Sequence, residues 1–481
     1  MRHSSIRLLS AFVVFALVAT ACGKDRSSSP ASSAVSTTAA PTPVTGGGGT
    51  TPVTEAVPVG PSFGNAPWPC GKGTGANTDA GTEVGVTKDS INIAGGDDAG
   101  FAGSPGLSHE LTQAIKAMVA KCNELGGING RKITYNYFDA KIFDVATAMQ
   151  AACDGKNFFL VGEGWAFDSQ QEEIRLKCGL PAVPTYTVSA AFAHAADVFQ
   201  GVPNPSDETP AGVFVQIATL FPNEVKHVGT LTGNFGATIE TRDKLVEVAP
   251  AYGWGFSEKT LESNAAGEPD WTPFAKQIKA SGATMVSWQG TCLPGLQLFA
   301  QAAKKEGLDV PIITDANHYT AQCAAANTDG ALDKLYTRMG FIPFEEAKLN
   351  KATQDYLDIM KAANGDIALL GMQATSSFLL WATAAEKCGA ELTRKCVLAN
   401  MKATHAWTGH GLHAETDPGD NHPPKCNIVM HLEGTEWKRV LPKEPGTFEC
   451  KDNWIAKVAS TPALIAAKLD ANRISQQFTG K

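Results

Sequence analysis

Hydrophobic residues along the chain follow two spacings that alternate with each other. From residue 108, apolar side chains recur every three or four positions, as on one face of a helix, until a glycine-rich stretch at 126–130 ends the segment. Other runs alternate apolar and polar residues, or are wholly apolar over a few positions, as at 158–161. Alternation of apolar and polar residues is typical of a half-buried strand, and a short, wholly apolar run is typical of a strand buried in a parallel sheet.

The two patterns predict a regular succession of strands and helices. Strands are expected at residues 84–94, 133–137, 158–161, 181–185, 227–231, 256–261, 285–288 and 310–314. Helices are expected at residues 108–122, 144–153, 169–178, 237–249, 270–280 and 294–305. Repeated strand-helix-strand units form parallel sheets with helices on both faces, so two sets of them predict an α/β protein with two lobes.

The first 22 residues have the pattern of an export signal. Arg2 and Arg7 precede a mostly apolar run at 8–19, which is too short to span a bilayer. The small residues before Cys22 resemble a bacterial lipobox, which would leave Cys22 as the lipidated first residue of the mature protein; cleavage of an ordinary secretory signal nearby is the alternative. We therefore expect an extracytoplasmic protein, anchored to the cell membrane by lipid alone.

A segment of low complexity follows the signal. It is mainly Ser, Thr, Pro, Ala, Val and Gly up to about residue 60, and such a composition buries too little apolar surface to offset the entropy of ordering. We expect a flexible tether over residues 23–83. The net charge of −8 is spread without long runs, which argues against a nucleic-acid partner.

Eleven cysteines suit an oxidising compartment. With Cys22 set aside for lipid, the even remainder favours five disulfides over metal ligation, and no pair has C-x-x-C spacing. The sequence does not determine the connectivity, although sequential pairing is plausible because Cys153 and Cys178 each end a predicted helix just before neighbouring strands. The ten are Cys70, Cys122, Cys153, Cys178, Cys292, Cys323, Cys388, Cys396, Cys426 and Cys450.

Several segments resemble one protein family. Residues 84–94 (VGVTKDSINIA) resemble the opening strand of the type I periplasmic binding proteins of the branched-chain amino acid and amide class, and residues 124–133 (ELGGINGRKI) are similar to that family's most recognisable segment. Further similarities are at 270–283, at 341–344 and in a late helix that contains Gln373. The resemblance covers about residues 84–440, and residues 451–481 form an extension beyond it.

This resemblance implies two Rossmann-like lobes joined by three crossover segments. The crossovers would lie near 202–207, 339–344 and 402–408. Lobe one would then comprise residues 84–201 and 340–405, and lobe two residues 202–339 and 406–450.

The resemblance also implies a function. Members of this family bind a small solute, such as an amino acid or amide, in the cleft between the lobes and deliver it to the permease of an ABC importer, without a cofactor. A sensor that presents its closed state to a signalling partner is the alternative, because closure around a ligand is the same population shift in both. An enzyme is not expected. The sequence has no H-E-x-x-H or P-loop motif, and its G-x-S-x-G match at 60–64 lies in the predicted tether.

Ligands of open α/β sheets bind beyond the carboxyl ends of the strands, so the loops there supply the candidate contacts. In lobe one these are Asp98, Glu163, Trp165, Phe167, Asp168, Thr185, Tyr186 and Thr187. In lobe two they are Phe235, Gly290, Thr291, Asp315 and Asn317.

The loop after the third strand departs from the family pattern. Trp165 and Phe167 stand where amino-acid-binding members have a serine-rich loop, so apolar contact would replace recognition of a carboxylate. We expect a ligand with an apolar or aromatic body and a few polar groups. Glu163, Asp168 or Asp315 would be available to pair an amine.

A histidine-rich stretch is the remaining candidate for chemistry. It contains His405, His410, His413 and His422, together with Asp417 and Asp420, and such residues could hold a metal. Its glycines and prolines favour a solvated hairpin instead, and no metal is expected.

Overall fold

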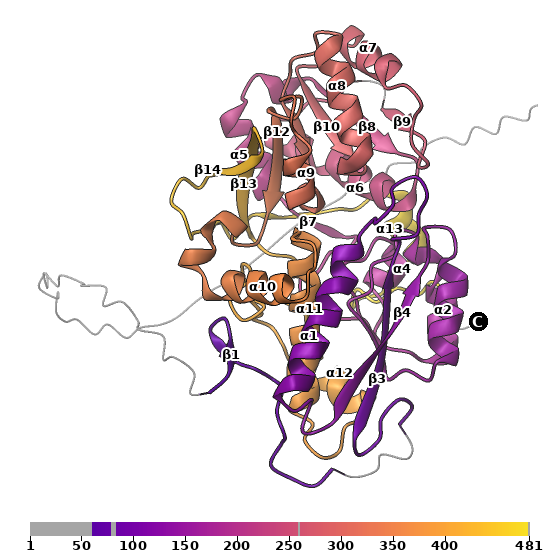
Figure 1. Cartoon of the computed structure of the whole chain (residues 1–481). Coiled ribbons are helices and arrows are strands. Elements are labelled where there is room, and N and C mark those ends of the chain that lie inside the picture. The colour runs from indigo at the N-terminus through magenta and orange to yellow at the C-terminus, as the bar shows by residue number, and fades with distance from the viewer. Residues whose placement is uncertain (1–59, 78–82, 258–259, 480–481) are drawn as a thin grey trace, which may run out of the picture. The chain divides into compact units, whose positions relative to one another are not determined.

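Two β-sheets, each covered by helices, organise the computed structural model of this protein (Figure 1). The structure describes residues 60–77, 83–257 and 260–479, which fall in one compact unit, Glu55–Lys481. The predicted α/β fold with parallel sheets in two lobes is confirmed.

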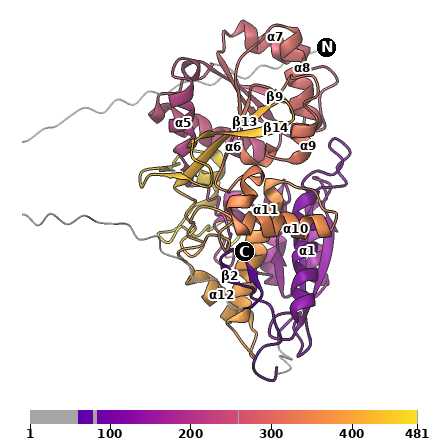
Figure 2. The same cartoon turned by 60° about the vertical axis from the view of Figure 1, so that its left-hand side comes forward.

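The sheet of lobe one has four parallel strands in the order β4-β3-β5-β6. They are β3 (Ser90–Asp97), β4 (Lys132–Asp139), β5 (Phe159–Val161) and β6 (Ala182–Val183). The helices around it are α1 (His109–Leu125), α2 (Val145–Asp154), α3 (Glu172–Cys178), α10 (Lys351–Ala362), α11 (Leu369–Glu386) and α12 (Arg394–Lys402). Helix α11 is buried on nearly every side and packs lengthwise on α1, which Figures 1 and 2 both show.

The sheet of lobe two follows the order β14-β13-β12-β11-β10-β8-β9, with β15 paired to β13. Its parallel strands are β8 (Val228–Gly233), β9 (Leu261–Ser263), β10 (Met285–Gln289), β11 (Ile312–Thr314) and β12 (Leu335–Met339). Its antiparallel strands are β13 (Cys426–Glu433), β14 (Glu436–Leu441) and β15 (Glu449–Cys450). The associated helices are α5 (Gly212–Leu220), α6 (Gly236–Val248), α7 (Thr272–Ala280), α8 (Gln297–Lys305) and α9 (Ala321–Ala325).

The chain passes between the two lobes three times, as expected for this fold. It leaves lobe one after β6 and enters lobe two at β8, returns between β12 and α10, and crosses again between α12 and β13. The sheet of lobe two is therefore completed by β13, β14 and β15, and lobe one by α10, α11 and α12, which all come from much later in the sequence.

The first strand begins later than its hydrophobic pattern predicts. Strand β3 begins at Ser90 rather than at residue 84, because Gly85 has a φ of 83° and the hydroxyl of Thr87 accepts hydrogen bonds from the amides of Asp89 and Ser90. These bonds close a turn that pairs Val86 with Ile91.

The predicted tether ends earlier than residue 83. Residues 60–77 pack on lobe one through strands β1 (Ser62–Phe63) and β2 (Ala66–Pro67), and the Phe63 side chain is fully buried. The prediction of a tether was wrong for these residues, because Phe63 and Trp68 supply apolar area that the preceding segment lacks. The predicted signal, Cys22 and the rest of the tether lie outside the described residues.

All five disulfides join cysteines that are consecutive in the described sequence, as sequential pairing suggested. They are Cys70–Cys122, Cys153–Cys178, Cys292–Cys323, Cys388–Cys396 and Cys426–Cys450. The first ties residues 60–77 to α1, and the last joins β13 to β15.

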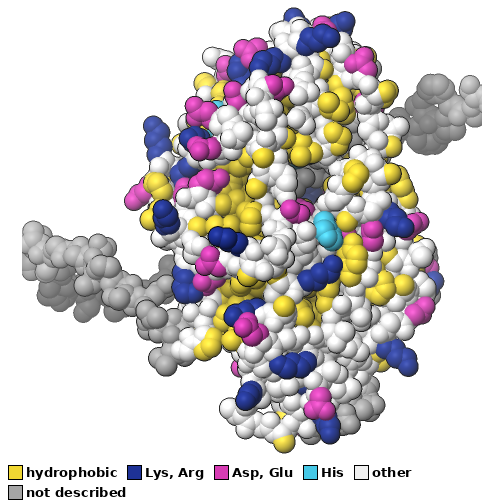
Figure 3. Space-filling model, in the orientation of Figure 1, with side chains coloured by type: hydrophobic (Ala, Val, Ile, Leu, Met, Phe, Trp, Pro, Cys, Tyr) yellow, Lys and Arg dark blue, Asp and Glu magenta, His cyan; other side chains and the backbone are white. Residues whose placement is uncertain are grey.

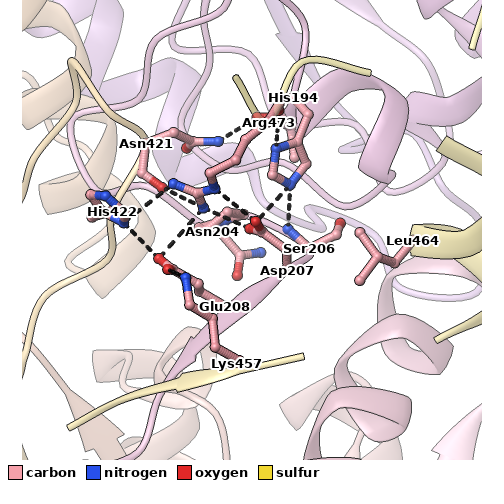
Figure 4. Close-up of polar contacts among 12 residues, drawn as sticks. His194, Asn204, Ser206, Asp207, Glu208, Asn421, His422, Lys457, Leu464 and Arg473 are labelled. Atoms are coloured by element: carbon pink, nitrogen blue, oxygen red, sulfur yellow. Dashed lines mark hydrogen bonds and ion pairs between the residues drawn. The ribbon is translucent and has the colours of Figure 1, made fainter. Parts of the chain in front are cut away.

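The C-terminal extension returns to the crossovers. Strand β16 (Ile455–Lys457) pairs with β7 (Glu208–Pro210) in the first crossover, and α13 (Pro462–Ala467) packs against α4 (Ala190–Ala193) in lobe one. Further along, the guanidinium of Arg473 donates two hydrogen bonds, of 2.7 and 2.6 Å, to the carboxylate of Asp207 (Figure 4). It also donates to the carbonyl oxygens of Asp420 and Asn421, which lie in the third crossover.

His194 completes this junction as a neutral imidazole (Figure 4). Its Nδ1 lies 2.8 Å from the carbonyl oxygen of Arg473 and therefore carries the proton, while its Nε2 accepts a hydrogen bond from the amide of Ser206. Burial lowers the pKa of His194 to about 4, which agrees with this tautomer.

Replacing Arg473 should destabilise the protein. In Arg473→Met the mostly buried carboxylate of Asp207 loses its bidentate partner, and we expect the free energy of unfolding to fall by about 2 kcal/mol. Thermal unfolding followed by circular dichroism measures the loss. The matched control is Lys468→Met, at an exposed position in the same extension. Equal melting temperatures for the two variants would contradict a structural role for the Arg473–Asp207 pair.

Candidate ligand-binding site

A cavity of about 600 Å³ lies at the carboxyl ends of the strands and is lined by both lobes. Lobe one contributes the loop at 104–108, Ala166 and residues 186–188, while α11 adds Leu369, Leu370 and Gln373. Lobe two contributes the loops that follow β8, β10 and β11, and one face of α6. A cavity of this size suits a drug-sized small molecule.

Seven of the predicted contacts line this cavity. They are Tyr186, Thr187, Phe235, Gly290, Thr291, Asp315 and Asn317. The remaining six, Asp98, Glu163, Trp165, Phe167, Asp168 and Thr185, lie behind its lobe-one wall.

Two of those six are carboxylates that fix the loops around the cavity. The oxygens of Asp98 accept hydrogen bonds from the amides of Ile142 and Ala166, at 2.7 and 2.8 Å. The oxygens of Asp168 accept from the amides of Val188 and Ser189, at 2.6 and 2.8 Å. Their charges are thus directed to the backbone of lobe one.

The aromatic pair of the same loop also faces inward. Trp165 is fully buried, and its indole NH donates to the carbonyl oxygen of Phe138. Phe167 is partly exposed and packs against the rings of Phe143 in lobe one and Phe235 in lobe two, so it contacts a cavity-lining residue across the cleft. Thr185 donates its hydroxyl proton to the carbonyl oxygen of Gly162.

Burial raises the pKa of the lobe-one carboxyl groups. The pKa rises to about 6 for Asp98, to about 7 for Asp168 and to about 8 for Glu163, and desolvation is the main cause in each case. Glu163 has the largest increase. One of its oxygens accepts a hydrogen bond from Gln171, and the other has no hydrogen-bond partner among the described residues.

The raised pKa of Glu163 predicts how the stability of the folded protein changes with pH. The folded protein keeps this proton at pH values where an unfolded chain, with a pKa of 4.5, has lost it. The stabilisation that protonated Glu163 gives the folded protein is therefore complete below pH 4.5 and is lost as the pH rises through about 8. In Glu163→Gln this loss should be absent, so the stability of the variant relative to the wild type should increase by up to about 4 kcal/mol from pH 4.5 to pH 9. Urea unfolding at several pH values, with the disulfides intact, tests this expectation. A stability difference that does not change with pH would contradict it.

Helix α6 presents cavity residues that the sequence did not reveal. Thr238, Thr241, Lys244 and Leu245 recur at helical spacing on the face that lines the cavity, and Glu240 lies beside them. A lysine and a glutamate four positions apart on a helix normally indicate a solvated face. Here both side chains are more than nine-tenths buried, which follows from the packing of the lobe and has no signature in the sequence.

The polar groups of lobe two differ in how they are paired. Asp315, one of the predicted partners for an amine, forms an ion pair of 2.6 Å with Arg338. The ammonium of Lys244 instead donates to neutral oxygens, at 2.7 Å to the carbonyl of Pro205 and at 3.4 Å to the side chain of Asn204. Within the described part of the chain, Lys244 forms no ion pair.

The histidine-rich stretch is not a solvated hairpin throughout. His413 and His410 are buried, and the Nε2 of His413 lies 2.8 Å from the hydroxyl of Ser376. The prediction was wrong for these two residues because the loop folds over α11. His405 lies near Asp417 and Asp420 in the arrangement of an exposed ion pair, which Lys402 joins.

On the face shown in Figure 3, basic and acidic side chains are intermixed. Among the described residues, no helix is long and apolar enough to cross a membrane.

The fold and the cleft define the class of a two-lobed binding protein. A family model described as periplasmic binding protein matches residues 96–436, most of the chain. This protein therefore belongs to the periplasmic binding protein family, and the resemblance noted from the sequence is confirmed. Comparison with curated proteins finds no match.

Solved structures show the same fold at low sequence identity. A leucine-binding protein from Thermotoga maritima has a TM-score of 0.61 and 14% identity, over 73% of this chain and 97% of its own. A fatty acid ABC transporter substrate-binding protein from Thermomonospora curvata has a TM-score of 0.60 and 15% identity, over 74% and 93%. The leucine-, isoleucine-, valine-, threonine- and alanine-binding protein from Brucella ovis has a TM-score of 0.61 and 16% identity, over 75% and 95%.

Proposed function

We propose that this protein is the extracytoplasmic solute-binding component of an ABC importer. The observation that carries the proposal is the cavity at the facing strand ends, which residues of both lobes line. A solute held there contacts both lobes at once and so favours their closed arrangement, which a permease can distinguish from the open one. The Thermotoga and Thermomonospora proteins are named for the binding of leucine and for the transport of fatty acids, respectively.

The proposed solute has an apolar body and a few polar groups. Tyr186, Phe235 and Leu369 provide apolar contact area, while Thr187 and Gln289 provide polar contacts. Because Glu163 and Asp168 do not line the cavity, we do not propose that these two carboxylates bind an amine of the solute.

A solute bound during growth should survive purification. We expect native mass spectrometry of residues 23–481 to detect a small molecule that is released when the protein is unfolded with its disulfides intact. The refolded protein is the matched control, and adding the released molecule back should raise its melting temperature. If no solute accompanies the protein and no small amphipathic molecule or amino acid raises its melting temperature, the proposed binding function is wrong.

The lipid anchor and the importer can be tested together in cells. We propose that Cys22 carries the lipid, so Cys22→Ala should move the protein from the membrane fraction to the soluble fraction and reduce uptake of the released solute. Its binding affinity should not change, because the ten disulfide cysteines remain. Unchanged membrane recovery of Cys22→Ala would contradict the anchor, and normal solute uptake in a strain without this protein would contradict the importer.

A further inference from the structure

Part of the cavity extends into the apolar interior of lobe two. Its walls are formed by Val213 and Phe214 of α5, by Leu245 of α6, by Ile313 of β11 and by Trp254. All five belong to one cluster of the hydrophobic core and are at least nine-tenths buried. We call the part of the cavity that these five residues line the lobe-two chamber.

Lys244 and Glu240 lie at the polar boundary of this chamber. Both line the cavity from α6, and Lys244 directly precedes the chamber residue Leu245. The residue Lys244 is only 6% exposed, yet the hydrogen-bond acceptors of its ammonium are neutral oxygens. One carboxylate oxygen of Glu240 is buried and has no hydrogen bond of normal geometry among the described residues, although the hydroxyls of Ser206 and Thr461 lie near the carboxylate. Burial of a charged or polar group is costly unless a partner compensates it, so this boundary is suited to a polar group of a ligand.

The competing cation of the cavity is already compensated. Arg338 also lines the cavity, but its guanidinium forms an ion pair with Asp315. Lys244 has no direct ion pair among the described residues, although nearby carboxylates, above all Glu240, attract it, and it is therefore the cation better placed to receive an anion.

We propose that the lobe-two chamber takes the aliphatic chain of an amphipathic carboxylic acid whose carboxylate contacts Lys244. This inference rests on the proposed function and names the chemical class of its solute. An aliphatic chain needs no hydrogen-bond partners. The chamber offers none, because four of its side chains are wholly apolar and the indole NH of Trp254 already donates to the carbonyl oxygen of Phe214. The carboxylate supplies the charged partner of Lys244, and a protonated carboxyl group of Glu240 can donate a hydrogen bond to it.

A series of fatty acids tests the chamber. Octanoate, decanoate and dodecanoate are titrated by calorimetry into residues 23–481 after removal of bound solute by unfolding and refolding. We expect the affinity to rise roughly fourfold for each methylene until the chamber is full. An affinity that does not depend on chain length would overturn the inference.

Two variants test the roles of the boundary and of the walls. Lys244→Met should weaken dodecanoate roughly ten- to hundredfold and leave 1-dodecanol unaffected, because it removes the charge and keeps most of the side-chain length. Val213→Phe should weaken dodecanoate by narrowing the chamber. Their matched controls are Lys276→Met and Val246→Phe, at exposed positions of the same lobe, and circular dichroism verifies that all four variants fold.

The outcomes separate this inference from the function on which it rests. Equal effects of Lys244→Met on the acid and on the alcohol would overturn the assignment of Lys244. If fatty acids do not bind while native mass spectrometry detects another solute, the chamber proposal fails and the solute-binding function stands. If neither is observed, both fail.

Discussion

The first crossover segment, residues 204–208, is the point on which the arrangement of the lobes and of the cavity depends. The side chain of Asn204 donates to the carbonyl oxygen of Thr187 in lobe one, and the amide of Ser206 donates to His194. Asp207 receives the two hydrogen bonds of Arg473, and Glu208 pairs with His422 and Lys457. Asn204, Ser206, Asp207 and Glu208 are thus all held by a side chain or backbone group of another segment.

Pro205 connects this junction to the cavity. Its carbonyl oxygen accepts the hydrogen bond of Lys244, so the position of the crossover also sets the position of the buried ammonium. The C-terminal extension therefore reaches the cavity indirectly, from Arg473 through Asp207 to Pro205. Residues 451–481 lie beyond the segment that matches the family, and their contacts with the crossover give them a structural role.

The two lobes contribute differently to the chemistry of the cavity. Lobe one directs the carboxylates of Asp98 and Asp168 to its own backbone, where they fix the loops that follow its strands. It presents the ring of Tyr186, the apolar residues of α11, and Glu110 and Asp366 to the cavity. Both basic side chains that line the cavity, Lys244 and Arg338, come from lobe two, so an anionic group of a solute would be bound on that side.

The sequence predicted the fold more completely than the site, for a physical reason. The spacing of apolar residues depends on local geometry, so the order of strands and helices followed from it, and sequential disulfides agree with that order. The direction of a loop side chain depends on what packs behind it. Trp165 and Glu163 therefore occupied the predicted loop but do not line the cavity, while Lys244 lay in a predicted helix whose sequence does not indicate that its side chain is buried.

The charge balance at α6 links ligand binding to protonation. Burial lowers the pKa of Lys244 and raises that of Glu240, so the low-dielectric surroundings favour the neutral form of each group, while their mutual attraction opposes both shifts. A carboxylate that enters beside Lys244 favours the charged ammonium and disfavours the charged form of Glu240. The incoming anion is then compensated by a cation that is already buried, and the neutral carboxyl group of Glu240 gains a proton that it can donate. The pair on α6 can in this way accommodate an acid without leaving a net uncompensated charge in the apolar interior of lobe two.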